Sequence, residues 1–448
     1  MSTRIAVIGT GYVGLISAVG LADFGNTVIG ADIDQTKIRR LQSGDPVIYE
    51  PGLAEYLRKN LDSGRLSFTS EVGEAVRSAA VVFNTVGTPP LPDGEVDLSQ
   101  VYSVADIIRE NLEGYKTIVT KSTVPVGTNR RIQQRLRQSA ERADFDVVSN
   151  PEFLREGKAV QDFFHPDRIV IGCETERARA VMAEIYRPMY LIERPFVWCG
   201  IETAELIKYA SNAFLATKVT FINQIANLCE AVGADVHTVA KAIGMDGRIG
   251  PKFLHPGPGY GGSCLPKDTA ALVKTGEHFG AEQSLVREVI LANRRQASRI
   301  AAKLEKALGS LREKNIAVLG LSYKAETDDV RDSPALRIIQ ELLERGARVQ
   351  AHDPQAIENC RMLFPRGVGF GKDAFEAVAQ ADALVLATEW NEYRNMDLLK
   401  VKALMRGSYI VDARNLLDPA GEFGDVRESV RIYYSALVDD PHHQIVCM

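Results

Sequence analysis

The chain has 448 residues, a formal net charge of −5 and 25% charged residues. At roughly 100–200 residues per domain, this length predicts two or three domains. The acidic balance argues against partners such as nucleic acid or an anionic membrane surface, and no apolar stretch approaches the roughly 18 residues typical of a membrane span. The six cysteines include no CxxC pair, and a strand-like run from residue 5 leaves no room for a signal peptide. We therefore expect a cytoplasmic protein.

The first 200 residues alternate short apolar runs with longer helical stretches, which is typical of βαβ units around a parallel sheet. Residues 5–9 and 27–32 are predicted strands, and residues 12–24 between them are a predicted helix. Later strand candidates follow at residues 80–84, 117–120, 145–148 and 167–172. We predict a doubly wound Rossmann domain over residues 1–200.

The strand signals vanish over residues 201–308, which we predict to be a central helical domain. Apolar residues recur at helical spacing over residues 204–232, a length unusual for one globular helix. Helices of this length usually bury an apolar face against another domain or another subunit. We therefore expect these residues to connect two domains and to form a homodimer interface.

The first pattern returns near the C-terminus. The sequence IAVIG at residues 5–9 is matched by IAVLG at residues 316–320, and a similar order of helix, Gly-turn and strand follows each copy. We therefore predict a second Rossmann-like domain over residues 309–448. Where the first copy continues GTGYVG at residues 9–14, the second reads GLSYKA at residues 320–325 and lacks two of the three glycines. The pattern leaves open whether the second domain holds a different nucleotide or none. The expected fold class is α/β, with two Rossmann-like doubly wound domains joined by a long central helical segment. Open α/β sheets bind ligands at the carboxyl ends of their strands, so this fold offers two nucleotide-sized sites.

A GxGxxG sequence lies between the first predicted strand and the following helix, at Gly9, Gly11 and Gly14. The first glycine permits a tight turn, the second lets backbone amides approach a pyrophosphate, and the third lets the helix pack on the strand. The helix N-terminus adds roughly half a positive charge where the phosphates bind. Asp32 ends the second strand, where its carboxylate can accept ribose hydroxyls and repels a 2′-phosphate. These features favour NAD over NADP.

The most unusual segment is HPGPGYGGSCLPKD at residues 255–268. Its closely spaced glycines suggest backbone wrapped around a ligand rather than a regular element. Pro266 suits the first turn of a helix, so Cys264 is expected just before a helix N-terminus and near Lys267, a setting that stabilises a thiolate and lowers its pKa. A small, inert, buried side chain is the more common role of a cysteine. Position alone leaves both interpretations open.

Four other polar residues are candidates for chemistry. Lys208 and Asn212 lie four residues apart and share one face of the long predicted helix. Glu152 and Glu156 could act as general acids or bases. Each signal is weak alone, because most lysines and carboxylates are solvated surface groups. The histidines show no metal-ligand spacing, and we predict no metal.

Taken together, the motifs resemble those of the UDP-glucose/GDP-mannose dehydrogenase family, the nucleotide-sugar 6-dehydrogenases. The resemblance covers nearly the whole chain. Besides the GxGxxG sequence and the Cys264 loop it includes YEPGL at 49–53, VGTP at 86–89, KSTVPVG at 121–127, NPEFLREG at 150–157, KYASN at 208–212, RIG at 248–250 and TDDVR at 327–331. It implies oxidation of a sugar C6 alcohol to a carboxylate, with two NAD per product.

The resemblance also implies a covalent mechanism. Cys264 is similar to the nucleophile that captures the C6 aldehyde as a thiohemiacetal, which is then oxidised to a thioester. Glu152 is similar to the general base for thioester hydrolysis, with Thr123 orienting the water. A covalent intermediate keeps the half-oxidised sugar in place for the second oxidation.

The remaining catalytic residues that the resemblance implies handle charge and protons. Lys208 and Asn212 are similar to the pair that stabilises a developing oxyanion. Asp268 is similar to the carboxylate that positions a water or that lysine. The first proton of the C6 hydroxyl has two candidate acceptors, namely Lys208 and a water held by Thr123 and Asp268.

The resemblance further implies that the domain over residues 309–448 binds the UDP-sugar, and it implies two sets of binding residues. NAD is expected to contact Gly9, Gly11, Tyr12, Val13, Gly14, Asp32, Lys37, Thr88, Thr123, Glu156 and Arg331. The sugar nucleotide is expected to contact Glu152, Phe153, Leu154, Lys208, Asn212, Arg248, Phe253, Tyr260, Gly261, Tyr323, Lys324 and Arg414. Arg248 resembles an arginine that reaches across from the dimer partner. The sequence RIGPKFL at residues 248–254 resembles the branch of the family that converts UDP-glucose to UDP-glucuronate.

Three other classes compete with this interpretation. A two-electron dehydrogenase of the hydroxyacid type would share the first domain and the helical segment, but it needs no thiol and forms one NADH per product. A short-chain epimerase or dehydratase relies on a Tyr-x-x-x-Lys pair, and no tyrosine of this chain has a lysine four residues later. A non-catalytic NAD-binding module leaves the Cys264 loop, Glu152 and Lys208 without a role.

Overall fold

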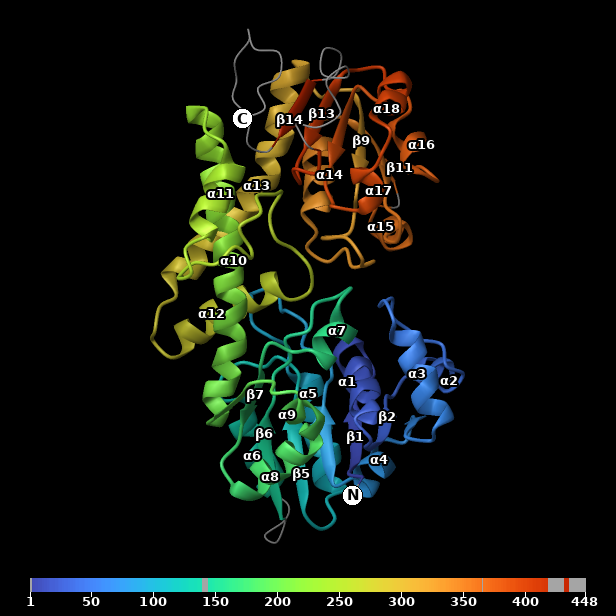
Figure 1. The fold of residues 1–448 in the computed structure, drawn as a ribbon, viewed down its shortest axis with the longest axis vertical. Coiled ribbons are helices and arrows are strands. Elements are labelled where there is room, and N and C mark those ends of the chain that lie inside the picture. The colour runs from blue at the N-terminus through green and yellow to red at the C-terminus, as the bar shows by residue number, and fades with distance from the viewer. Residues whose placement is uncertain (1, 139–143, 365, 418–430, 435–448) are drawn as a thin grey trace. The chain divides into compact units, whose positions relative to one another are not determined.

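The computed structural model describes residues 2–138, 144–364, 366–417 and 431–434 (Figure 1). The chain divides into two compact units, each with its own sheet. Unit 1 comprises Met1–Ser211 and Lys274–Ala281, and unit 2 comprises Asn212–Val273 and Glu282–Met448. No helix in the described residues combines the length and the apolar character needed to cross a membrane.

The sheet of unit 1 has eight strands among the described residues, in the order β3-β2-β1-β4-β5-β6-β7-β8. Neighbouring strands are parallel except β6 and β7, which are antiparallel. The strands are β1 (Arg4–Ile8), β2 (Thr27–Ala31), β3 (Leu66–Thr69), β4 (Val81–Asn84), β5 (Lys116–Thr120), β6 (Phe145–Ser149), β7 (Ile169–Gly172) and β8 (Phe196–Cys199). The order from β3 to β6 is that of a dinucleotide-binding Rossmann sheet.

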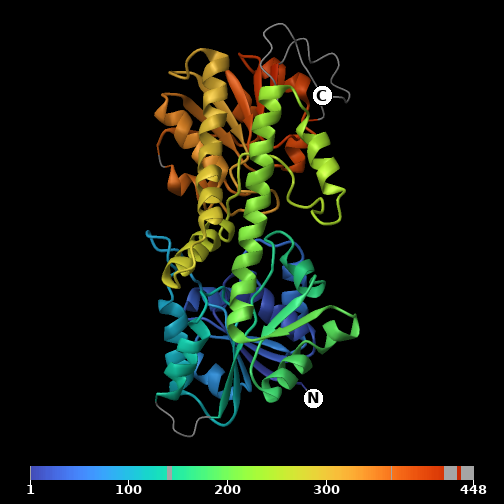
Figure 2. The same ribbon diagram turned by 90° about the vertical axis from the view of Figure 1, so that its left-hand side faces the viewer.

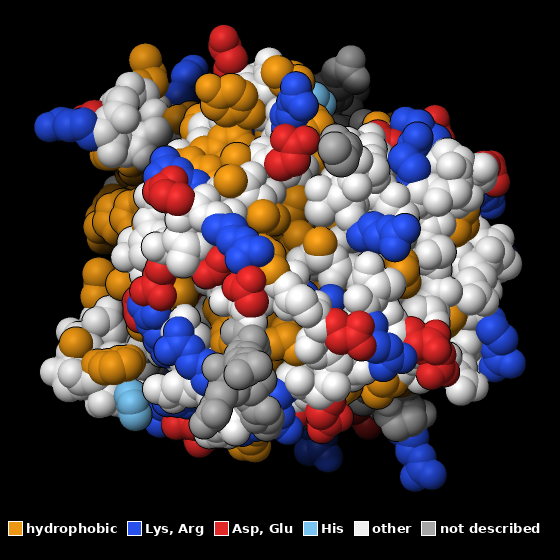
Figure 3. Space-filling model, turned by 90° about the horizontal axis from the view of Figure 1, so that it is seen from below, with side chains coloured by type: hydrophobic (Ala, Val, Ile, Leu, Met, Phe, Trp, Pro, Cys, Tyr) orange, Lys and Arg blue, Asp and Glu red, His pale blue; other side chains and the backbone are white. Residues whose placement is uncertain are grey.

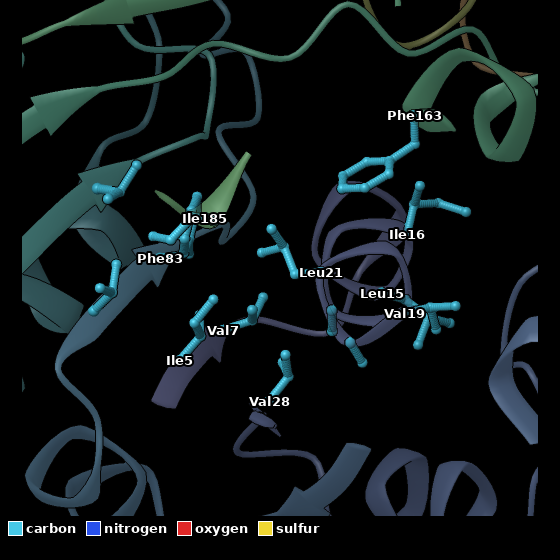
Figure 4. Packing of buried hydrophobic residues seen from close by; sticks show 14 of the residues in the cluster. Ile5, Val7, Leu15, Ile16, Val19, Leu21, Val28, Phe83, Phe163 and Ile185 are labelled. Atoms are coloured by element: carbon cyan, nitrogen blue, oxygen red, sulfur yellow. The ribbon is translucent and has the colours of Figure 1, made fainter. Parts of the chain in front are cut away.

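Helices cover the sheet of unit 1 and bury its strands. They are α1 (Tyr12–Asp23), α2 (Gln35–Gln42), α3 (Leu53–Asp62), α4 (Val72–Ser78), α5 (Ser99–Glu110), α6 (Thr128–Arg137), α7 (Ala159–Phe164), α8 (Glu176–Ile185) and α9 (Arg187–Leu191). Figure 4 shows Val7, Leu21 and Val28 pointing toward one another from β1, α1 and β2. The continuous apolar sequence of β1 reflects burial on both faces of a parallel sheet.

The sheet of unit 2 repeats the strand order from β3 to β6 of unit 1. Its described strands are all parallel and follow the order β11-β10-β9-β12-β13-β14. They are β9 (Asn315–Leu319), β10 (Arg348–His352), β11 (Val368–Phe370), β12 (Ala383–Leu386), β13 (Tyr409–Asp412) and β14 (Arg431–Tyr434). The helices around them are α14 (Pro334–Glu344), α15 (Ile357–Leu363), α16 (Ala374–Val378), α17 (Asn391–Arg394) and α18 (Leu398–Leu404). The predicted pair of Rossmann-like folds is thereby confirmed.

The long central helix is also confirmed. α10 spans Ile201–Val232, and the boundary between the units falls within it, after Ser211. It is followed by α11 (Val236–Gly244), α12 (Leu265–His278) and α13 (Ser284–Leu308). In unit 2, α13 runs beside the second half of α10 (Figures 1 and 2), and Asn227 Nδ2 donates a hydrogen bond to Gln296 Oε1 at 3.2 Å.

Two strands of unit 1 were not predicted from the sequence. β3 and β8 are the two edges of the sheet and have four residues each. One side of an edge strand faces no neighbouring strand, so such strands tolerate polar and half-exposed residues, and their hydrophobic pattern is weak.

Figure 3 shows one face of the molecule, on which acidic and basic side chains are interspersed with apolar ones.

Candidate active site

The three glycines of the GxGxxG turn have different surroundings. Gly9 has a φ of 93°, and a Cβ added there would lie 2.9 Å from Val86 Cγ1. A Cβ on Gly14 would lie 1.8 Å from the carbonyl oxygen of Gly9, so this residue lets α1 pack on the turn. A Cβ on Gly11 would meet no atom within 4 Å. Because protein atoms leave this space open beside the N-terminus of α1, the turn fits a dinucleotide pyrophosphate.

Asp32 follows β2 and presents an ionised carboxylate near this turn. Its Oδ2 atom accepts hydrogen bonds from the backbone N and the Oγ1 of Thr10, both at 2.9 Å, and from Lys37 Nζ at 2.9 Å. Burial opposes ionisation, but the hydrogen bonds from Lys37, Asp34 and Thr10 lower the pKa of Asp32. Lys37 therefore holds the carboxylate that we predict to bind the adenosine ribose.

The loops after β4 and β5 carry two other predicted cofactor contacts. Thr88 and Thr123 are both half-buried on these loops. Ser122 Oγ donates a hydrogen bond to the carbonyl oxygen of Val86 at 2.7 Å, which ties the two loops together. They leave the carboxyl ends of neighbouring strands, where ligands of such sheets bind.

Glu152 and Lys208 form a buried ion pair in unit 1. Lys208 Nζ lies 3.1 Å from Glu152 Oε1, and the two side chains are 4% and 5% exposed. Lys208 Nζ also lies 5.2 Å from the centre of the Phe153 ring, and the Arg168 guanidinium stacks on the same ring at 3.6 Å. Burying two charges is costly unless they are paired. This pair therefore indicates a functional site, and the structure brings together three residues that the sequence singled out separately.

Lys121 is a further buried cation, which the sequence analysis did not single out. Its Nζ atom lies 3.2 Å from Asn150 Oδ1 and 3.3 Å from Tyr186 Oη. Burial lowers the pKa of Lys121 to about 8, the charge of Glu152 opposes this shift, and the charge of Lys208 adds to it. Two sequence signals could have identified it, namely its place directly after the buried strand β5 and its position at the start of the KSTVPVG motif.

In unit 2, Cys264 lies directly before the 14-residue helix α12, as its sequence context predicted. The side chain is half-buried, it is not part of a disulfide, and its Sγ atom lies 3.5 Å from Ser263 Oγ. Gly262 has a φ of 82°, and a Cβ there would lie 2.7 Å from the Tyr323 ring. A Cβ on Gly261 would lie 2.4 Å from the carbonyl oxygen of Asp332. The glycines are thus needed for close packing around the thiol segment.

A chain of polar contacts follows Cys264 on α12. Asn212 Nδ2 donates a hydrogen bond to Asp268 Oδ2 at 2.6 Å, and Lys267 Nζ donates to Asp268 Oδ1 at 2.6 Å. Asp268 is 1% exposed. We expected Lys267 to favour the Cys264 thiolate, but in the structure its ammonium group pairs with this buried carboxylate.

Buried amide side chains hold the rest of the Gly-rich loop, and the sequence analysis missed them. Asn223 Oδ1 of α10 accepts a hydrogen bond from the backbone N of Gly257 at 2.7 Å. Asn293 of α13 accepts from the backbone N of Tyr260 at 2.8 Å and donates to its carbonyl oxygen at 3.0 Å. An isolated asparagine in a helical sequence gives no signal of such a role.

The predicted substrate residues of the second sheet lie partly together. Arg414 Nη2 donates a hydrogen bond to the Tyr323 carbonyl oxygen at 2.6 Å, and Lys324 Nζ lies 5.4 Å from the centre of the Tyr323 ring. Tyr323 is the residue whose ring packs against Gly262. Arg414, Lys324 and the Cys264 loop are therefore joined through Tyr323 within unit 2.

Of three other predicted contact residues, Arg331 touches the Cys264 loop through its backbone, because the N of Gly262 donates a hydrogen bond to its carbonyl oxygen at 2.8 Å. Arg248 is 89% exposed and pairs with Asp246, and Arg331 is 66% exposed and pairs with Asp329. Phe253 has a left-handed φ of 66° on the loop after α11. The roles of these residues stay predictions, as do the roles of the other site residues.

The second sheet has an aspartate that corresponds to Asp32, but its environment differs. Asp353 Oδ2 accepts hydrogen bonds from the backbone N atoms of Leu321 and Ser322, from Ser322 Oγ and from Trp390 Nε1, at distances of 2.7 to 3.1 Å. Asp353 is 2% exposed. Because the protein itself satisfies this carboxylate, the second sheet does not offer it to a ribose.

The open glycine turn and the ionised Asp32 in unit 1 define a dinucleotide-dependent dehydrogenase with two Rossmann-like sheets. The chain belongs to the UDP-glucose/GDP-mannose dehydrogenase family. Residues 3–190 match its NAD binding domain, residues 202–295 its central domain and residues 317–419 its UDP binding domain. The resemblance found in the sequence is confirmed, and NAD is the cofactor.

Characterised relatives match along almost the entire chain. UDP-glucose 6-dehydrogenase of Rhizobium meliloti strain 1021 is 51% identical over 417 residues, which cover 92% of this chain and 95% of that protein. The structure of a UDP-glucose dehydrogenase from Pyrobaculum islandicum matches with a TM-score of 0.89, 40% identity and 98% coverage of both chains. A UDP-D-ManNAc dehydrogenase from Pyrococcus horikoshii matches with a TM-score of 0.85 and 28% identity, covering 97% of this chain and 99% of that one.

Proposed function

We propose that this protein oxidises the C6 alcohol of UDP-glucose to the carboxylate of UDP-glucuronate. The overall reaction consumes two NAD and one water and releases two NADH and three protons. The observation that carries the proposal is the half-buried Cys264 thiol at the start of α12, in a loop whose glycines permit close packing. The relative that is 51% identical, a UDP-glucose 6-dehydrogenase, supports this choice of substrate.

Cys264 explains how one enzyme can perform two successive oxidations. Its sulfur adds to the C6 aldehyde left by the first oxidation, which forms an S–C6 bond and a thiohemiacetal hydroxyl. Loss of a hydride and a proton from that adduct yields a thioester. Water then cleaves the S–C6 bond and releases the carboxylate and the thiol. NAD, when bound, accepts the hydride in each oxidation.

The buried ion pair of unit 1 supplies the acid–base chemistry. Glu152 acts as the general base that activates the hydrolytic water, and Thr123 orients that water. Lys208 stabilises the oxyanion that develops at C6, because a buried ammonium group interacts strongly with a nearby anion. In unit 2, Asp268 fixes the amide orientation of Asn212, which we propose to share this oxyanion role.

The predicted binding residues belong to the same proposal. We assign the sugar nucleotide to a set that includes Phe253, Tyr260, Gly261, Tyr323, Lys324 and Arg414, with Arg248 contributed by the partner subunit. Arg331 is assigned to NAD.

We also propose functional domains over residues 1–200, 201–308 and 309–448. The five described cysteines carry no disulfide, and the mechanism needs a reduced thiol, which supports a cytoplasmic location.

A homodimer through α10 is part of the proposal. Exposed apolar side chains follow one face of this helix, with Phe214, Phe221 and Leu228 at intervals of seven residues. Their exposed fractions are 64%, 49% and 57%. A seven-residue apolar repeat is the pattern by which two helices pack along their length. A second copy of α10 satisfies this requirement.

The test is the ratio of NADH to product. The protein is incubated with NAD and, separately, with UDP-glucose, UDP-D-ManNAc and GDP-mannose, and the acid product is quantified. We expect turnover of UDP-glucose with two NADH per product. A ratio of one would rule out the covalent four-electron mechanism, and preference for another sugar nucleotide would move the chain to another branch of the family.

Three variants separate the thiol chemistry from folding. Cys264→Ala should abolish formation of UDP-glucuronate, whereas Cys173→Ala, another half-buried cysteine of the chain, should retain it. Cys264→Ser should accumulate a covalent ester detectable by intact-protein mass spectrometry, because an alkoxide is a poorer leaving group than a thiolate. Full activity of Cys264→Ala would overturn the mechanism.

A further inference from the structure

Glu50, in the sequence YEPGL, is a buried carboxylate with no role in the mechanism above. It is 7% exposed. Its Oε2 atom accepts hydrogen bonds from the Tyr12 hydroxyl and from the backbone N of Gly157, the latter at 2.7 Å. Its Oε1 atom accepts from the backbone N of Ala159 at 2.7 Å. Within the described residues, no lysine or arginine forms an ion pair with it.

The donors of these hydrogen bonds come from two separate parts of unit 1. Tyr12 directly follows Gly11 and begins α1, so it belongs to the dinucleotide turn. Gly157 and Ala159 end the segment that carries Glu152 and Glu156 and lead into α7. Gly157 N also lies 3.3 Å from the Tyr12 hydroxyl, so the three groups form a closed cluster. Glu50 is the acceptor that all of them share.

The burial of this carboxylate makes its hydrogen bonds strong and specific. A buried charge without a cation depends on well-aligned donors, and hydrogen bonds to ionised acceptors are stronger than neutral ones. Burial, and then the hydrogen bond to Glu50, raise the pKa of Tyr12, so this hydroxyl stays protonated and remains a donor. The cluster therefore favours one relative position of the dinucleotide turn and the segment from Glu152 to Ala159.

We propose that Glu50 is a positioning residue that fixes the dinucleotide turn to the Glu152–Glu156 segment and so preorganises the NAD pocket. The inference deepens the proposed function, because it rests on the assignment of Tyr12 and Glu156 to NAD. It does not depend on the identity of the sugar nucleotide. A preformed pocket binds NAD without first ordering two separate segments, which improves affinity.

The test measures NAD affinity and backbone protection without any sugar nucleotide. Glu50→Gln retains the shape of the side chain but replaces one acceptor oxygen by a donor NH₂ group. We expect its Kd for NAD, measured by calorimetry, to rise about tenfold, the effect of losing one charge-assisted hydrogen bond. Hydrogen exchange should accelerate at the amides of Gly157 and Ala159. Glu55→Gln, an exposed carboxylate on α3, is the matched control and should change neither quantity.

Tyr12→Phe completes the experiment and remains informative if Glu50→Gln fails to fold. It should weaken NAD binding and accelerate exchange at Gly157. The Kd of the double variant for NAD should be about equal to that of whichever single variant binds NAD more weakly, because both changes break the same cluster. An unchanged Kd in Glu50→Gln, or strictly additive effects, would overturn the positioning role. If these variants change NAD binding as expected but the wild-type protein does not oxidise UDP-glucose, only the proposed substrate is overturned.

Discussion

Gly11 and Gly14 lie one helical turn apart, yet the space around them differs. Gly11 has a φ of −72°, which any residue adopts, and a Cβ there meets no protein atom within 4 Å. A Cβ on Gly14 would lie 1.8 Å from a backbone oxygen. The first position therefore serves the ligand and the second serves the fold.

This contrast predicts opposite behaviour of two alanine variants. Gly11→Ala should keep the thermal stability of the protein but weaken NAD binding by roughly tenfold or more, because the methyl group occupies the open space. Gly14→Ala should lower the free energy of unfolding by about 1–3 kcal/mol, the usual cost of overpacking. Thermal unfolding and NAD calorimetry on both variants test the assignment. It fails if Gly11→Ala destabilises the fold as strongly as Gly14→Ala.

Lys121 gives a prediction about pH. Its pKa is about 8 in the folded protein against a usual value of 10.5. Between these pH values the unfolded chain holds a proton that the folded protein has released, so this group makes the free energy of unfolding rise with pH. The contribution between pH 8 and pH 10.5 is about 3 kcal/mol. This contribution is absent in a variant whose side chain at position 121 cannot titrate.

Chemical denaturation at pH 7.5 and at pH 10 measures this contribution. The free energy of unfolding of the wild type should rise by about 2 kcal/mol relative to Lys121→Met between the two pH values. Lys402→Met, an exposed substitution on α18, corrects for the loss of one positive charge. An unchanged difference between wild type and Lys121→Met would show that Lys121 remains charged in the folded protein.

The sequence predicted which residues belong to the site better than it predicted which residues they contact. Lys208 and Glu152 each gave a weak signal, because a lysine on a helix and a glutamate after a strand are usually solvated. Their ion pair joins positions 56 residues apart, and only the tertiary fold brings them together. Lys121 and Glu50 lie in the quoted motifs KSTVPVG and YEPGL, but their roles were missed because a single sequence does not show that these two side chains are buried.

At the scale of elements, α10 is attached to α6 through Glu205. Glu205 is 2% exposed. Its carboxylate accepts hydrogen bonds from the backbone N atoms of Gly127 and Asn129, at 2.7 and 2.9 Å, and from Asn129 Nδ2 at 2.8 Å. An acidic group at a helix N-terminus satisfies amides that have no partner within the helix and interacts well with the helix dipole. Lys208 lies three residues later on the same helix.

Removing this carboxylate should therefore destabilise unit 1. Glu205→Ala should lower the free energy of unfolding by about 3 kcal/mol, because three buried donors lose their acceptor. Glu202→Ala, whose carboxylate is 44% exposed and pairs with Arg130, should lower it by less than about 1 kcal/mol. Comparable losses in the two variants, measured by denaturant unfolding, would contradict the capping role of Glu205.

Local sequence patterns predicted whether a segment is a helix or a strand more reliably than they predicted where that segment begins and ends. The strands β1, β4 and β9 are apolar except for one terminal residue each, because they are buried on both faces, and this made them easy to find. β3 and β8 are short edge strands without that pattern. The long helix was predicted from residue 204 and begins at Ile201, a difference that reflects the weak signal of a first helical turn.

At the scale of the whole molecule, the exposed face of α10 predicts the oligomeric state. Phe221→Arg should convert a dimer to a monomer, because it places a charge in the middle of the apolar repeat. Met362→Arg, at a residue that is 75% exposed on α15, should leave the dimer intact. Light scattering coupled to size-exclusion chromatography distinguishes the two masses. A wild-type protein that is monomeric at high concentration would exclude this interface.

Six described strands of each sheet follow the same order, but the sequence could not show how far the ligand-binding edges of the two sheets have diverged. Asp32 and Asp353 directly follow equivalent strands, β2 and β10, and their sequence contexts are alike. Asp32 is held by Thr10 and Lys37 beside an open turn, whereas Asp353 is enclosed by Trp390 and the backbone of Ser322. The difference arises from Trp390, which lies 37 residues after Asp353.

The enclosure of Asp353 limits how the C-terminal half could be re-engineered. Restoring a GxGxxG sequence after β9 would rebuild the turn, but the indole of Trp390 would still compete with an adenosine for the same carboxylate. A designer seeking a second coenzyme pocket would have to remove that indole and accept a void in the core around it. Specialisation of the two halves is thus secured by one aromatic side chain as well as by missing glycines.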